Sequence, residues 1–383
     1  MRKINKKRIL LTIGIVVIII ILIVLISLYI VNNNIRNWVD INIFRKNVSE
    51  QDIQTINLNT DKNNQVHVYS DFIAVLNDKM ITLYNSYGEK ITALDVNINS
   101  ALFDSSDKYL AVAEENGHEI CLILDKTYMW SQELEGEILQ IHVNKNGYVA
   151  VVTVDVTHKS IVTFFNSQGK KLFTSYFAST RIVDADISHD NKYIAIVELD
   201  TTGTIIKSSV KILSVENAQK DSENTIIYTY EAEAGDLITN VKYQSKNQIA
   251  CIYDNGLGVI VNMTYKEVIK INNENITYLA NDFNNNVVYV KEESAGLFKS
   301  QSDVHIVNTS DFQEKIYKLE TLAKDVFARD NIIAINVGTE IYFIDTNGWL
   351  IKKYTANQEI TNVKISESLA IIIYKDRIVI VDL

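Results

Sequence analysis

Short apolar segments recur along this chain from residue 53 onward, each separated from the next by turn-forming residues. Six of them share one form, five residues with alanine third, and these alanines are Ala74, Ala111, Ala150, Ala195, Ala250 and Ala334. Ala370 continues the series, and Tyr289 takes the same place once. The positions lie about 36 to 55 residues apart, which is the interval of β-propeller blades and too long for leucine-rich or ankyrin repeats.

A second, β-branched segment follows each alanine segment and ends on a residue type that initiates turns by bonding its own backbone: Asn85, Asp125, Asn166, Ser214, Asn262, Asn308, Asp345 and Asp382. Further short apolar segments precede each alanine segment and follow each second segment, for example 182–187 and 171–176. Glycines fall between or just after these segments, as expected for hairpins. The pattern therefore predicts four strands per unit, and no helical period interrupts it.

Eight such units predict an all-β fold, a β-propeller of about eight four-stranded blades, or seven if one weak unit is merged. The last unit stops at Asp382 and Leu383, where its outermost strand is due. A spare strand-like segment, IQTINL at 53–58, precedes the first full unit. We expect these two ends to pair, because pairing closes the ring and covers an exposed edge. We expect the repeated alanines on the second strand of each blade, facing a neighbouring blade.

An apolar run begins at Ile9 and ends at Val31, which is enough residues to cross a hydrocarbon core of ~30 Å. Five basic residues and no acid lie in positions 1–8, a flank that stays cytoplasmic. We expect a cytoplasmic tail at 1–8, a transmembrane helix at 9–31, a juxtamembrane linker at 32–51 and a propeller at 52–383 outside the cytoplasm. The alternative is a cleaved secretory signal, although the run exceeds the ~7 to 15 apolar residues usual there and no small-residue cleavage site follows it.

The linker contains Trp38 with Ile35, Ile41, Ile43 and Phe44. Tryptophan at this position commonly lies at the level of the lipid headgroups. The segment is predicted either to lie in the membrane interface or to act as a plain tether, and both keep the propeller near the bilayer.

The stretch CLILDKTYMWSQELEG at 121–136 resembles the repeat of quinoprotein-like propellers and of outer-membrane-assembly lipoprotein propellers, where an aspartate turn precedes Trp and Ser. The turns in FDSSDKYLAV and ISHDNKYIAI look like WD40-type and TolB-type hairpins. The chain consists of a basic anchor followed by an Asn-rich propeller. Over essentially its full length it resembles a clostridial family of unknown function, DUF5711. That resemblance implies an architecture and no known activity. Only Trp130 and Trp349 lie in the propeller, too few for a quinone-docking girdle, so no cofactor is expected.

Charge and residue chemistry exclude several functions. Beyond the basic flank the chain has 32 basic and 47 acidic residues, a net charge of about −15, which disfavours nucleic acid or an anionic wall polymer as partner. Cys121 and Cys251 lie in apolar segments of different units and are expected to be free. Asp104 and Asp107 lack the rest of a calcium loop and are interpreted as hairpin residues. Six scattered histidines give no metal spacing: His67, His118, His142, His158, His189 and His305.

No catalytic, cofactor-binding or metal-binding residue is therefore assigned. The leading hypothesis is a non-catalytic, membrane-anchored interaction module that binds a protein or glycan of the cell envelope through its loops. The alternative is an envelope hydrolase or lyase, with acidic residues from several blades converging at the channel mouth. A sensor of small ligands is a third possibility, but the tail at 1–8 is too short to receive a signal except through a partner helix.

Overall fold

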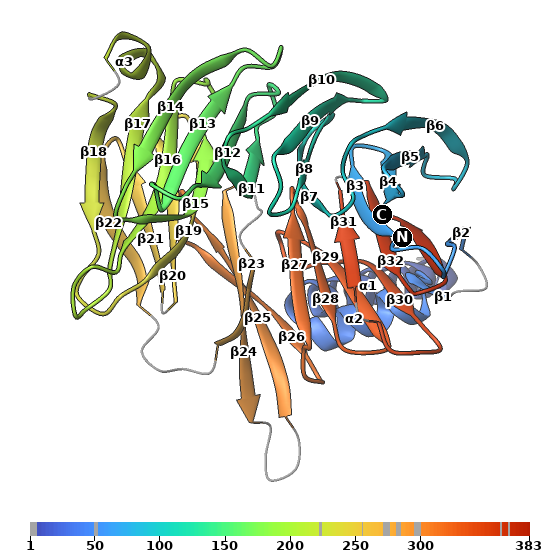
Figure 1. Ribbon diagram of the computed structural model, residues 1–383. Helices are drawn as coiled ribbons and strands as arrows, with labels where there is room; N and C mark the ends of the chain where they lie inside the picture. Colours follow the sequence, from blue (N-terminus) through green and yellow to red (C-terminus); the bar gives the residue numbers. More distant parts are fainter. Residues whose placement is uncertain are drawn as a thin grey trace.

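The computed structural model describes residues 6–49, 53–221, 224–254, 256–270, 276–280, 285–294, 300–360, 362–366 and 368–383. Its strands form eight sheets arranged around a central axis as the blades of a propeller (Figure 1). From residue 65 onward, the strands of each blade follow one another in sequence order from the centre outward, and each pairs antiparallel with the next. The predicted all-β propeller with eight blades is confirmed, and the alternative of seven is wrong.

The first four blades run from residue 65 to residue 231. Blade 1 contains β3 (Gln65–Tyr69), β4 (Phe72–Asn77), β5 (Met80–Tyr84) and β6 (Lys90–Asp95). Blade 2 contains β7 (Ala101–Ser106), β8 (Tyr109–Glu114), β9 (Glu119–Leu124) and β10 (Thr127–Glu133). Blade 3 contains β11 (Glu137–Val143), β12 (Val149–Val154), β13 (Ser160–Phe165) and β14 (Lys171–Phe177). Blade 4 contains β15 (Arg181–Ile187), β16 (Tyr193–Asp200), β17 (Lys207–Ser214) and β18 (Ile226–Glu231), with the short helix α3 (Val215–Lys220) before β18.

The other four blades complete the ring. Blade 5 contains β19 (Ile238–Ser245), β20 (Gln248–Tyr253), β21 (Gly256–Val261) and β22 (Thr264–Lys270). Blade 6 contains β23 (Ile276–Ala280), β24 (Asn286–Ser294), β25 (Ser300–Asn308) and β26 (Glu314–Leu319). Blade 7 contains β27 (Asp325–Arg329), β28 (Ile332–Asn336), β29 (Glu340–Asp345) and β30 (Leu350–Thr355), and blade 8 contains β31 (Asn362–Ile365), β32 (Leu369–Ile373) and β33 (Arg377–Asp382).

The ring closes through the two ends of the propeller sequence, as predicted. Strand β2 (Thr55–Asn57) pairs antiparallel with β33 and supplies the outermost strand of blade 8, with Ile56 buried opposite Ile378. A second N-terminal strand, β1 (Asn47–Ser49), pairs parallel with β30 as a fifth strand of blade 7. In Figure 1 these blue strands lie beside the red strands of the last two blades. Strand β1 is not predicted by the sequence pattern, because the three residues NVS show no period.

Central and outer strands differ because only the central ones are covered on both faces. Strand β12 has five consecutive buried residues, since one face packs on blade 2 and the other on blade 4. Strand β10 is exposed at most positions and buries Trp130. This explains why the alanine segments read as continuous apolar runs, a pattern that a strand shows when both its faces are buried.

The repeated alanines all lie on the second strand of a blade and are fully buried. Six of them pack against the next blade in the chain; Ala150, for example, contacts the core between blades 3 and 4. Ala370 and Tyr289 instead face the preceding blade, because Ile371 of blade 8 and Val288 of blade 6 face forward. A one-residue difference in register moves a strand side chain to the opposite face. The series therefore has six members in phase, and these two are out of phase.

Both cysteines are free and buried, as expected. Cys121 lies on β9 and Cys251 on β20, in the cores of different blade interfaces. Burial raises the pKa of the Cys121 thiol to about 12 and raises that of Cys251 as well, so both are protonated at neutral pH. They act as small apolar side chains.

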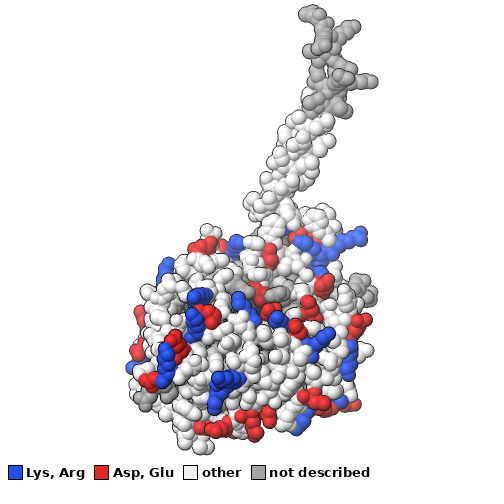
Figure 2. Space-filling view, turned by 90° about the horizontal axis from the view of Figure 1, so that it is seen from above, with Lys and Arg blue, Asp and Glu red and all other residues white. Residues whose placement is uncertain are grey.

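Two helices precede the propeller. The first, α1 (Lys6–Val31), contains the one described segment long and apolar enough to cross a membrane, Ile13–Val31. The second, α2 (Asn33–Asn42), lies within the segment predicted as a linker. Figure 2 shows the described part of α1 as an uncharged stalk that projects from the propeller.

Helix α2 docks on blade 7 at the turn between β29 and β30. Arg36 donates to the carbonyl oxygen of Gly348 at 2.9 Å, and its guanidinium lies 5.0 Å from the ring centre of Trp349. Asp40, fully buried, accepts a hydrogen bond from the hydroxyl of Tyr29 in α1 at 2.8 Å. Lys46 lies 3.2 Å from the same carboxylate. These contacts join the end of the apolar helix to the propeller.

The docking site defines two ends of the propeller. We call "anchor end" the side that carries the turns between strands 1 and 2 and between strands 3 and 4 of each blade, including Gly348. We call "far end" the opposite side, which carries the loops between strands 2 and 3 and those between blades. The polar chemistry of the two ends is different.

Candidate functional site

The central channel is lined by the first strand of each blade, and the buried polar side chains of these strands include His67, Ser105, Asp184 and Asp186. At its anchor end lies a cavity of about 270 Å³, to which blades 2, 3, 4, 5 and 7 contribute. Ser105, Asp186, His189, Lys242 and Arg329 are among the residues that line it. This is the channel mouth at which the alternative hypothesis places a hydrolase or lyase site.

The channel carboxylates hold neighbouring blades together. Asp104 of β7 accepts a hydrogen bond from the backbone N–H of Val143 in blade 3 at 2.6 Å. In blade 4, Asp184 and Asp186 accept from the N–H groups of Val241 and Tyr243 in blade 5, at 2.8 and 2.6 Å. Charge-assisted bonds of this kind to backbone N–H groups are strong. Asp107 lies in the turn after β7, as expected, whereas Asp104 lies on the strand and joins two blades rather than forming the hairpin.

The basic side chains of the channel either form hydrogen bonds with another blade or lie close to other positive charges. Arg329 reaches from blade 7 to blade 2, where it donates to the carbonyl and hydroxyl oxygens of Ser105. The ring of His67 shares that hydroxyl at 2.8 Å. Burial, with the charges of Arg329 and Lys364, lowers the pKa of His67 well below its usual value, so His67 is neutral. Burial likewise lowers the pKa of Lys364.

His142 is the channel residue that most resembles part of a catalytic pair. Its Nε2 lies 3.7 Å from a carboxylate oxygen of Asp184, beyond hydrogen-bonding distance. Burial lowers the pKa of His142 and raises that of Asp184, so their environment opposes an ion pair. Among the described residues no hydroxyl or thiol contacts the ring of His142 at hydrogen-bonding distance, and the pair lies between two blades.

The six histidines lie apart on different blades or turns. Among the described residues no group of three or more His, Cys, Asp or Glu is placed to hold a metal ion. His305 of β25 contacts Glu314 at 2.9 Å, and the hydroxyl of Tyr289 donates to the same carboxylate. The expectation that no residue is catalytic, cofactor-binding or metal-binding stays a prediction.

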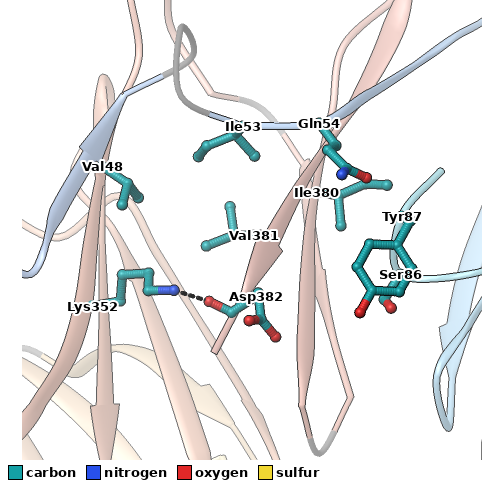
Figure 3. Close-up of a pocket in the computed structure, with 9 residues that line it drawn as sticks. All are labelled: Val48, Ile53, Gln54, Ser86, Tyr87, Lys352, Ile380, Val381 and Asp382. Atoms are coloured by element: carbon teal, nitrogen blue, oxygen red, sulfur yellow. Dashed lines mark hydrogen bonds between the residues drawn. The ribbon is translucent and has the colours of Figure 1, made fainter.

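A second cavity lies where the ring closes. It has a volume of about 310 Å³ and is bounded by the N-terminal strands, the end of β33 and the turn after β5. Figure 3 shows Ile53 and Val381 facing this space, with Tyr87 on the opposite side. Lys352 of blade 7 donates to the backbone carbonyl oxygen of Asp382. The cavity lies at the anchor end, beside the strands that join the propeller to α2.

A third cavity, of about 410 Å³, lies at the far end between the outer strands of blades 4 and 5. Tyr230, Tyr253 and Tyr265 line it together with four carboxylates, Glu231, Glu233, Asp236 and Glu267. This group of side chains is not apparent from the sequence, because its tyrosines come from three strands of two blades. One signal was present, since Gly258 in the segment DNGLG lies inside a strand, where glycine often marks a close approach by another group. The sequence pattern, in which glycines fall between or just after strands, does not distinguish Gly258 from a hairpin glycine.

Two solved structures are similar to this chain. The structure of BamB from Moraxella catarrhalis has a TM-score of 0.52 and 11% sequence identity, covering 86% of this chain and 96% of that one. The WD40 domain of Neurospora crassa Pan2 has a TM-score of 0.47 and 10% identity, covering 73% of this chain and 87% of its own. A search of curated proteins gave no significant match.

The propeller and the segment that leads into it match one family over residues 44–383, most of the chain. The full set of blades and the closing strand β2 lie inside this range. The resemblance inferred from the sequence is thereby confirmed, and this chain belongs to the family of unknown function DUF5711.

Proposed function

We propose that this protein is a membrane-anchored, non-catalytic interaction module that holds a protein or glycan of the cell envelope on a propeller outside the cytoplasm. The apolar helix α1 serves as a retained anchor, with its basic flank in the cytoplasm. The far end of the propeller is the binding side. Propellers commonly use loops on a rigid scaffold in this way.

The observation that carries the proposal is the docking of α2 at one end of the ring. Arg36 and Asp40, one helical turn apart, face the propeller, and Tyr29 near the end of α1 contacts Trp349. Tyr29 of the apolar helix thus belongs to the set of contacts through which α2 docks on the propeller. This favours a retained anchor over a cleaved signal, because cleavage after the run would remove Tyr29 from Asp40.

Exposed apolar side chains next to α1 support the same arrangement. Trp38, Ile43 and Phe44 are each about 60% exposed, and Ile35 is exposed beside them. Side chains of this kind are suited to the membrane interface. An interfacial segment at this position keeps the anchor end near the bilayer and leaves the far end free for a partner.

The channel gives no support for catalysis. Asp104, Asp184 and Asp186 are bound to backbone N–H groups of the next blade, which gives these three carboxylates a structural role. Acid–base chemistry needs a group within reach of a substrate and free to exchange its proton. A binding role needs only the exposed loops of a stable ring.

Crosslinking in intact cells tests the proposal. The full-length protein, treated with a membrane-impermeant crosslinker and analysed by mass spectrometry, is expected to yield one reproducible envelope partner. A reporter that is active only outside the cytoplasm, fused after Leu383, is expected to be active. Activity of a cytoplasm-only reporter at this position would contradict the orientation. A single channel-lining Asp or Glu whose substitution abolishes a measurable turnover would overturn the non-catalytic role.

A further inference from the structure

The far-end cavity between blades 4 and 5 is built around stacked tyrosines. The rings of Tyr230 on β18 and Tyr265 on β22 are parallel within 11°, with centroids 3.7 Å apart. Tyr253, at the end of β20, meets Tyr265 edge to face at 6.4 Å, and its hydroxyl donates to that of Tyr230 at 3.1 Å. The three side chains therefore form one aromatic group that bridges the two blades.

A glycine makes this arrangement possible. Gly258 lies in the middle of β21, and a Cβ atom at this position would lie 2.4 Å from the ring and hydroxyl of Tyr265. No real Cβ contact is that short, so any other residue would displace the tyrosine. Tyr265 lies flat between Gly258 and Tyr230, which indicates that the sequence maintains the position of this ring.

Carboxylates surround the aromatic group, and no lysine or arginine lines the described part of the cavity. Glu231 and Glu267 are exposed, and neither has an ion-pair partner among the described residues. The nearest basic residue in sequence, Lys266, turns its ammonium group to the ring of Phe312, 4.2 Å from the centroid. The charges of Glu231 and Glu267 are therefore not neutralised by an ion pair with the described residues.

The floor of the cavity is apolar. Leu257 is buried, and Ile269 is half-buried beside it. A site with an apolar floor, aromatic walls and a carboxylate rim matches a long cationic side chain, in which a hydrocarbon stem carries a charged head. Aromatic rings attract cations through their quadrupole, and carboxylates form charge-assisted hydrogen bonds with them.

The surrounding surface has the same sign of charge. In the described far-end loops acidic residues outnumber basic ones: Asp61, Asp78, Glu115, Glu135, Asp155, Glu233, Asp236, Asp254, Glu320, Glu359 and Asp376, against Lys62, Lys79, Lys159, Lys324 and Lys375. A surface of this kind attracts a positively charged partner and raises its association rate.

We propose that this cavity binds a lysine or arginine side chain of a protein partner. The inference rests on the proposed interaction function and specifies the chemistry of the partner. Tyr230, held in place by the ring of Tyr265 stacked on it, contributes the aromatic wall, and Glu231 and Glu267 contribute the charge. A glycan would also use tyrosines and carboxylates, but Glu231 and Glu267, which are exposed and have no ion-pair partner among the described residues, favour the cation.

Binding of a labelled tetralysine peptide tests the site. The full chain in detergent is titrated with the fluorescent peptide, and anisotropy is measured at low and physiological salt, with tetraglutamate as the negative probe. Glu231→Gln with Glu267→Gln is expected to weaken binding about tenfold, in line with a charged contact beside aromatic rings. Gly258→Ala is expected to weaken binding to a similar extent, because it displaces Tyr265 while leaving every charge in place.

A matched pair of substitutions separates the site from general attraction. Glu133 ends the outermost strand of blade 2 as Glu231 ends that of blade 4, and Glu135 follows it in an exposed loop. Glu133→Gln with Glu135→Gln makes the same change in net charge outside the cavity and is expected to alter binding less than twofold. Equal losses in the two pairs, or no binding of tetralysine by the unmodified chain, would overturn the site.

The following outcomes distinguish a failure of this site from a failure of the proposed function. If Gly258→Ala fails to fold, which thermal unfolding reports, the Glu231 and Glu267 variant decides alone. An envelope partner captured equally by the unmodified chain and by that variant would retain the interaction function and overturn the cation site. A glycan captured equally by the unmodified chain and by the Glu231 and Glu267 variant would also retain the interaction function and overturn the cation site. Absence of any partner in cells, with tetralysine binding intact, would contradict the proposed function only.

Discussion

The anchor end and the far end of this propeller are built from the same blades and differ in how their polar groups are used. At the anchor end, Arg36, Asp40 and Arg329 are bound by other parts of the chain. At the far end, Glu231 and Glu267 are exposed and unpaired among the described residues. Charged groups that a chain satisfies internally support its structure, whereas those left exposed beside an aromatic cavity remain available to a partner. Attachment is thereby assigned to the anchor end and recognition to the far end.

Deleting residues 53–58 should produce the largest effect, because both ends depend on a closed ring. The deletion removes β2 and buried Ile56 and exposes the edge of β33. We expect loss of more than about 4 kcal/mol of stability, beyond the usual range of a point substitution. Circular dichroism during heating measures it on the full-length protein. Thr55→Ser, at an exposed position of β2, serves as the control, and an equal melting temperature for both proteins would mean that the termini do not close the ring.

Overpacking the core between blades is expected to rank second. Ala150 and Ala195 are fully buried against the next blade, so replacing either with leucine should cost roughly 1 to 3 kcal/mol. Ala93→Leu, on the exposed outer strand β6, should change stability by less than ~0.5 kcal/mol. Equal unfolding free energies for the buried and exposed substitutions would contradict the assignment of the alanines to blade interfaces.

The turns of the two ends can be compared directly through two asparagines with positive φ. At the anchor end, the side-chain oxygen of Asn191 (φ 62°) accepts hydrogen bonds from Asn144 and Asn146 of blade 3, at 2.6 and 3.0 Å. At the far end, Asn116 (φ 55°) is exposed. Asn191→Ser should therefore cost about 1 kcal/mol more than Asn116→Ser, the net value of a buried hydrogen bond. The sequence alone does not reveal these bonds, because they join turns of two different blades.

The smallest effect on global stability is expected from Asp40→Ala. This substitution removes the acceptor of the Tyr29 bond and the partner of Lys46, so α2 should detach while the ring stays folded. Hydrogen exchange of the backbone in 33–42 should accelerate by at least tenfold, and the melting temperature of the propeller should stay nearly unchanged. A drop in melting temperature as large as that of the ring-opening deletion would show that α2 is part of the cooperative unit.

The sequence predicted those parts of the fold that depend on repeated patterns. Blade number, the second-strand position of Ala150 and ring closure by 53–58 follow from periodicity and from the missing final strand. It did not predict β1, or the docking of α2 through Arg36, because each depends on a few residues that meet a distant blade. Long-range contacts of this kind leave no local period.

The candidate site was harder to predict than the fold. Tyr230, Tyr253 and Tyr265 belong to three strands, and only the packing of blades 4 and 5 brings their rings together. The unpaired state of Glu231 also depends on which side chains the ring brings near it. Gly258 was the one local signal, since a glycine within a strand suggests that another group lies close to its backbone.

Site-specific photo-crosslinking in intact cells tests the division between the two ends most directly. A photoreactive residue is placed either at Thr202, in the exposed far-end loop before β17, or at Gln168, in the exposed anchor-end turn before β14. We predict that Thr202 captures an envelope protein partner and that Gln168 does not, and that Glu231→Gln with Glu267→Gln reduces the adduct. Capture of the same partner from Gln168 and not from Thr202 would contradict the assignment of recognition to the far end.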